Sequence, residues 1–170
     1  EGSAIGLASG YYIGTNQIPL VYMQNSGLGN AINPLLSLTD PEVYSIPMLI
    51  LIGWRGEPGV KDEPQHIKQG KVQLDLLKSL KLPYKIISKN SDDYKTIIDS
   101  ALDYAKKNTS PYVILIKKNT FKKNKYNPDI SSKNILSLTR EYVLKKILQS
   151  VPSDAIIVST TGKTSREIFE

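Results

Sequence analysis

Ile18-Pro-Leu-Val-Tyr-Met-Gln-Asn-Ser-Gly-Leu-Gly-Asn30 is the stretch of this chain that decides its fold class. Its first seven residues are a mostly apolar run that predicts a buried strand, and residues 28–38 have the apolar spacing of a helix, interrupted near Pro34. The small residues 25–30 predict a turn at the junction. A strand, a small-residue turn and a helix present free backbone N–H groups to a ligand in α/β proteins, and glycine allows close approach. We therefore expect a ligand-binding α/β protein.

The alternation of strand and helix patterns continues along the chain. Further strands are predicted at 47–53, 84–88, 112–116 and 154–159, and further helices at 1–14, 67–80, 94–108 and 139–148. This order predicts a mostly parallel sheet with helices on both faces, whose ligands lie beyond the carboxyl ends of the strands. Polar segments follow three of the strands, at 25–30, 54–66 and 160–165. We expect these segments at or near that edge of the sheet.

Composition excludes several classes of function. The 170 residues contain no run of about 20 apolar residues and no secretory signal, so we expect no membrane partner. The absence of Cys excludes disulfides and is compatible with a cytoplasmic location, and a single His excludes a His-rich metal site. The net charge of +6 derives largely from Lys, with a cluster at 117–125 that mixes with Asn and Thr. That mixture is typical of a solvated linker, so we expect no nucleic-acid partner.

The chain has the organisation of a fragment. It opens on Glu1 inside a helix-like pattern and stops at Glu170, just after a second turn-and-helix signal. We therefore expect a protein truncated at both ends. The predicted divisions are a first domain at 1–118, a polar linker at 119–137 and the start of a second domain at 138–170.

Two nucleotide motifs are incomplete. Thr161-Gly-Lys-Thr164 resembles the end of a phosphate-binding loop, but that loop needs a glycine at position 157, which is Ile. Gly27-Leu-Gly29 lacks the third glycine of a dinucleotide fingerprint, and no acidic residue follows at the expected distance. We therefore expect neither nucleotide hydrolysis nor a dinucleotide cofactor.

A different combination resembles a known family. Glu1-Gly-Ser-Ala-Ile-Gly-Leu-Ala-Ser-Gly-Tyr-Tyr12, then Gly27-Leu-Gly-Asn-Ala-Ile-Asn33, then the strand at 47–53 resemble the pyrimidine-binding domain of thiamine-diphosphate-dependent decarboxylases. Leu28 stands where that family usually has Pro. Trp54-Arg-Gly-Glu-Pro-Gly-Val-Lys-Asp-Glu-Pro-Gln-His66 and Thr161-Gly-Lys-Thr-Ser-Arg-Glu167 are most similar to members that act on 3-phosphonopyruvate, with those that act on sulfopyruvate close. The resemblance implies a thiamine-diphosphate-binding fold, with a pyrimidine-binding domain at 1–118 and the start of a diphosphate-binding domain at 138–170.

The resemblance also implies roles for residues near the cofactor. Glu1 would be the catalytic carboxylate, which hydrogen-bonds the ring nitrogen of the aminopyrimidine. The cofactor contacts would be Ser26, Gly27, Leu28, Thr161 and Gly162. The competing interpretations are that Glu1 is an exposed terminus and that the turn at 161–165 merely caps a helix.

Substrate-binding residues are expected in the polar segment after the strand at 47–53. Arg55, Lys61 and His66 could bind the carboxylate and phosphonate of a small 2-oxoacid by charge-assisted hydrogen bonds, together with Gln65 and Arg166. Glu57, Asp62 and Glu63 could instead pair with those cations and make an ordinary surface loop. His66 could also shuttle a proton, or be merely structural.

The implied activity is decarboxylation of 3-phosphonopyruvate to phosphonoacetaldehyde and CO₂ by a homodimer or larger homo-oligomer. The family binds the diphosphate through Mg²⁺ with a Gly-Asp-Gly motif, which this chain lacks. We therefore expect no metal ligands within it, weak cofactor binding at best and no turnover by the fragment alone. A non-catalytic α/β module that binds an anionic small molecule at 26–30 is the competing hypothesis.

Overall fold

The computed structural model describes residues 1–91, 93–122, 139–158 and 166–168. The chain divides into two compact units, residues 1–123 and 124–170. The predicted linker lies mostly outside the described residues, as do Thr161 and Gly162.

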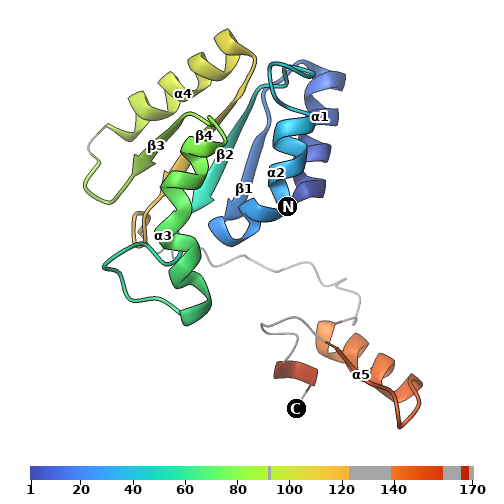
Figure 1. The fold of residues 1–170 in the computed structure, drawn as a ribbon. Coiled ribbons are helices and arrows are strands. Elements are labelled where there is room, and N and C mark those ends of the chain that lie inside the picture. Colours follow the sequence, from blue (N-terminus) through green and yellow to red (C-terminus); the bar gives the residue numbers. More distant parts are fainter. Residues whose placement is uncertain (92, 123–138, 159–165, 169–170) are drawn as a thin grey trace, which may run out of the picture. The chain divides into compact units, whose positions relative to one another are not determined.

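The first unit is built on a four-stranded parallel sheet (Figure 1). Its strands are β1 (Leu20–Gln24), β2 (Met48–Gly53), β3 (Tyr84–Ile87) and β4 (Pro111–Ile116), in the order β1-β2-β4-β3. The two central strands are almost continuously apolar because helices cover both faces of the sheet around them. A helix in each connection carries the chain back for the next parallel strand. The prediction of an α/β fold with a parallel sheet is confirmed.

Helices lie on both faces of the sheet, as predicted (Figure 1). Side chains of α1 (Gly2–Thr15), α2 (Asn25–Ser37) and α3 (Pro64–Ser79) share one apolar core with alternate residues of β1, β2 and β4. The intervening strand residues form a second core with α4 (Tyr94–Asn108). Because one helix covers that second face, the β1 side of it stays open, and Leu20 and Tyr22 are 62% and 70% exposed there.

Two helices begin earlier than the sequence pattern predicts. The predicted turn at 25–30 is instead the first part of α2, which starts at Asn25 and contains Pro34 without ending there. Likewise α3 starts at Pro64, a residue whose fixed φ and missing N–H suit the first turn of a helix. Gln65 and His66 therefore lie on a helix rather than in a loop. The apolar periodicity located the helix interiors but not their polar first turns.

The second unit contains α5 (Arg140–Ser150), which begins where predicted. The Thr139 hydroxyl caps it by accepting a hydrogen bond from the backbone N–H of Tyr142 at 3.2 Å. The predicted strand at 154–159 is wrong over the described residues 155–158, which are irregular. Ile156 and Val158 are 92% and 90% exposed, and the described residues offer them no neighbouring strand.

In the part of the chain that the structure describes, no helix is both long enough and apolar enough to cross a membrane.

Candidate functional site

Asn25 ties two polar segments together at the carboxyl edge of the sheet. Its side chain is almost fully buried, with Nδ2 donating to the Arg55 carbonyl at 2.9 Å and Oδ1 accepting from the Arg55 N–H, also at 2.9 Å. Asn25 is the first residue of α2, and Arg55 lies two residues beyond β2. The start of α2 and the loop after β2 therefore form one fixed unit.

Glu1 lies against the start of α2. Its carboxylate occupies the space over Gly27, where an added Cβ would lie only 2.5 Å from Glu1 Cδ and Oε1. Asn30 Nδ2 donates a long hydrogen bond of 3.4 Å to Glu1 Oε2. The structure thus brings Glu1 and Gly27, two of the predicted site residues, into direct contact.

The other predicted cofactor contacts on α2 differ in access. Ser26 is half-buried, whereas the Leu28 side chain is fully buried in the core and offers no surface to a ligand. The side chain of Gln24, the N-cap residue of α2, makes no capping hydrogen bond. Contact between a cofactor and the start of α2 stays a prediction. For Leu28, only the backbone could make that contact, because its side chain is buried.

Arg55 is paired with Asp62 in the loop after β2. Arg55 Nη2 and Nε donate to the Asp62 carboxylate at 2.5 and 2.8 Å, and that carboxylate also accepts from the backbone N–H groups of Gly56 and Glu63. These hydrogen bonds, chiefly the one from Arg55, hold the pKa of the Asp62 carboxyl well below its usual range. The hydrogen bond to Asp62 in turn raises the pKa of the Arg55 guanidinium above its ordinary value. The pairing that the sequence left open is therefore present, and it fixes the conformation of this loop.

Arg55 and Asp62 also line a cavity of about 280 Å³ at the ends of β1, β2 and β4. Lys117 and Lys118, directly after β4, contribute two further cations to its lining. Lys117 Nζ lies 2.6 Å from a Glu57 carboxylate oxygen. The lining therefore carries three cationic side chains and the Asp62 carboxylate.

Sequence reasoning missed these two lysines because it assigned the whole cluster at 117–125 to a linker. The available signal was their position directly after a strand, since parallel strands place their carboxyl ends at one edge.

The remaining predicted substrate residues are placed separately. Lys61 is exposed, and its carbonyl accepts a 2.8 Å hydrogen bond from Lys118 Nζ. Gln65 is exposed on the first turn of α3, next to His66, whose Nδ1 is buried and has no hydrogen-bond partner among the described residues. Neither Gln65 nor His66 lines the 280 Å³ cavity. Arg166 is exposed in the second unit.

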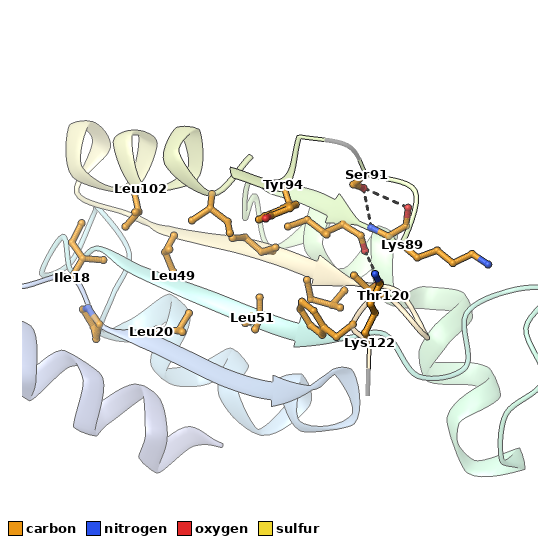
Figure 2. A pocket seen from close by; sticks show the side chains of 17 residues that line it. Ile18, Leu20, Leu49, Leu51, Lys89, Ser91, Tyr94, Leu102, Thr120 and Lys122 are labelled. Carbon is orange, nitrogen blue, oxygen red and sulfur yellow. Dashed lines mark hydrogen bonds between the residues drawn. The ribbon is translucent and has the colours of Figure 1, made fainter. Parts of the chain in front are cut away.

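A larger cavity of about 580 Å³ lies between α4 and the open face of the sheet, and Figure 2 shows its apolar floor of Leu20, Leu49 and Leu51. Its lining is mostly apolar, although Lys89 and Lys122 also contribute to it, so it is a weaker candidate site for a small anion. Among the described residues no group of three or more His, Cys, Asp or Glu side chains could hold a metal ion.

The fold and this edge define an α/β protein with a carboxylate and a cation-lined cavity at the carboxyl ends of a parallel sheet. No family model matches the chain. It is 33% identical over 182 residues to phosphonopyruvate decarboxylase of Streptomyces viridochromogenes, an alignment that covers 99% of this chain and 45% of that protein. The phosphonopyruvate decarboxylase of Streptomyces hygroscopicus is 32% identical over 182 residues, which again cover 99% of this chain and 45% of that protein. Sulfopyruvate decarboxylase subunit alpha of Methanococcus maripaludis is 40% identical over 101 residues, 59% of this chain and 58% of that subunit.

The chain is therefore a relative of the phosphonopyruvate and sulfopyruvate decarboxylases, which confirms the resemblance drawn from the motifs. It spans less than half the length of the phosphonopyruvate decarboxylases that it matches.

Proposed function

We propose that the full-length protein decarboxylates 3-phosphonopyruvate to phosphonoacetaldehyde and CO₂ with thiamine diphosphate as cofactor. The observation that carries this proposal is the similarity to two phosphonopyruvate decarboxylases along 99% of the chain. The site adds support, because the chain has an exposed carboxylate, Glu1, at the sheet edge where α/β proteins bind ligands.

The residues at this edge fit the proposed cofactor. Glu1 is paired with no cation in the described part of the chain, so its carboxyl group is available to hydrogen-bond the aminopyrimidine. That carboxyl group occupies the space over Gly27 that a Cβ would fill. When bound, thiamine diphosphate supplies the electron sink for the pair released as CO₂ leaves.

The cavity beside Arg55 is the proposed place for an anionic substrate, which would share Arg55 with Asp62 and Lys117 with Glu57. Arg55, Lys117 and Lys118 line it, and charge-assisted hydrogen bonds from such groups bind carboxylates and phosphonates strongly. We therefore propose that the substrate lies between Glu1 and these cations. His66 and Gln65 stay proposed contacts that would need the substrate to extend beyond this cavity. Arg166, in the second unit, also stays a proposed contact.

Mg²⁺ is proposed to bind the diphosphate through residues outside this chain. The 170 residues contain no Gly-Asp-Gly motif, through which the family binds Mg²⁺, so we propose that this chain alone binds the cofactor weakly and has no turnover.

The main alternative substrate is sulfopyruvate, which the names of several relatives favour. Some relatives are named as subunit alpha, so the proposed assembly is either a homo-oligomer or a complex with a second kind of subunit. Light scattering on the purified protein, alone and with any co-purified subunit, would separate these two.

The deciding experiment measures aldehyde release by the full-length protein with each substrate, with and without thiamine diphosphate and Mg²⁺. We expect release only with both cofactors present and faster turnover of phosphonopyruvate. Faster turnover of sulfopyruvate would make sulfopyruvate the main substrate and 3-phosphonopyruvate the alternative. A folded protein that binds either anion but releases no aldehyde would favour the non-catalytic binding module.

A further inference from the structure

We propose that Gly27 and Asn30 are positioning residues that hold the Glu1 carboxylate in its working place over the first turn of α2. This inference rests on the proposed function, because it takes Glu1 as the catalytic carboxylate. In this inference, the role of Gly27 is to leave space for the Glu1 carboxylate rather than to contact a ligand directly.

The start of α1 lies unusually close to α2. An added Cβ at Gly2 would lie 2.9 Å from the Asn30 carbonyl oxygen, so only glycine allows this approach. That carbonyl has no N–H partner four residues on in the helix, because residue 34 is proline. The contact between Gly2 and Asn30 fixes where α1 begins and therefore where Glu1 lies.

Gly27 provides the space that the Glu1 side chain fills. It is buried and helical, with no positive φ, so an added methyl group would cause no backbone strain of its own. The atoms nearest to that methyl group are Glu1 Cγ, Cδ and Oε1. These belong to a flexible side chain, which moves more easily than backbone. Gly27→Ala should therefore leave the fold intact and move the carboxylate.

Asn30 holds the other side of the carboxylate. Its Nδ2 donates to Glu1 Oε2 at 3.4 Å, and both side chains are exposed. A long exposed hydrogen bond orients a group rather than stabilising the fold. Loss of this amide should therefore cost roughly 2- to 10-fold in kcat.

The test uses the full-length protein with Gly27→Ala, Asn30→Ala and a control, Gly10→Ala. Gly10 is an exposed glycine of α1 whose added Cβ meets nothing within 4 Å. We expect Gly27→Ala to lower kcat about 100-fold, as displacement of a catalytic group by about 1 Å can do. The control should keep the wild-type kcat, and all variants should keep the thermal midpoint of unfolding within a few degrees.

Two readouts separate positioning from a structural role. A crystal structure of Gly27→Ala without ligands should show the Glu1 carboxylate moved from residue 27 while α1 and α2 stay in place. In a double-mutant cycle with Glu1→Gln, the Gly27→Ala change should cost almost nothing further, because the group that it moves is already disabled.

Failure of this inference differs from failure of the proposed function. A wild-type protein that releases no aldehyde would refute the proposed function. An active wild-type protein whose Gly27→Ala variant keeps both its kcat and its Glu1 position would overturn the inference alone. Equal losses from Gly27→Ala with and without Glu1 would overturn it as well, because the loss would then have another cause.

Discussion

Asn25→Ala is expected to loosen the sheet edge that carries the proposed site. The Asn25 side chain is 4% exposed and makes two 2.9 Å hydrogen bonds, one to the N–H and one to the carbonyl of Arg55. Each bond contributes about 1 kcal/mol net, and a partner left unsatisfied adds a further penalty of about 1 kcal/mol or more. The free energy of unfolding should therefore fall by roughly 2–4 kcal/mol, a drop in thermal midpoint of roughly 5–15 °C.

Urea unfolding followed by circular dichroism measures this loss. Asn25→Asp is the sharper variant, because it keeps the acceptor for the Arg55 N–H but turns the donor into an oxygen that faces the Arg55 carbonyl. We expect it to be at least as unstable at neutral pH. Asn33→Ala, an exposed residue of the same helix, is the control and should change stability by less than about 0.5 kcal/mol. An Asn25→Ala protein as stable as that control would refute the reasoning.

Three further changes test other parts of the account. Leu28→Ala should cost about 2–5 kcal/mol in urea unfolding, because Leu28 is fully buried in the core; a loss below about 1 kcal/mol would place this side chain at the surface. Gly70→Ala should destabilise the protein by about 1–3 kcal/mol or more, because an added Cβ would meet the carbonyl oxygens of Gly56 and Arg55; an unchanged thermal midpoint would contradict that contact. The pKa of Asp62 is lowered in the fold, so its carboxylate stabilises the protein fully above the unfolded pKa of about 3.9 and loses that effect as the pH falls below it. Asp62→Asn should therefore reduce the fall in the free energy of unfolding between about pH 5 and pH 2. If that fall were the same in Asp62→Asn as in the wild type, the Asp62 carboxylate would be excluded as its cause.

Much of the fold follows from local pattern. The strands β2 and β4 are continuous apolar runs, which only a sheet covered on both faces accommodates. Helices such as α2 and α4 follow from a local pattern too, since each has an apolar face at helical spacing. The predicted strand at 154–159 failed over its described part because β-propensity alone cannot supply the neighbouring strand that a ladder needs.

The site was less predictable because it depends on pairings between distant residues. Sequence placed Arg55 among several possible acidic partners, but only the folded loop selects Asp62. The role of Asn25 needs a hydrogen-bonded partner 30 residues away, and the contact of Glu1 with Gly27 needs the crossing of two helices. Local patterns do not encode such distances, whereas the resemblance to the decarboxylases reached Glu1 and Gly27 through their motifs.

The most direct test of the central claim is the effect of Glu1→Gln on turnover by the full-length protein. The change keeps the length of the side chain but removes its charge and its ability to exchange a proton with the proposed cofactor. We expect kcat for aldehyde release from 3-phosphonopyruvate to fall at least about 100-fold, with the thermal midpoint unchanged. Glu42→Gln, an exposed control outside the site, should keep its kcat. A Glu1→Gln protein that turns over the substrate as fast as this control would contradict the account.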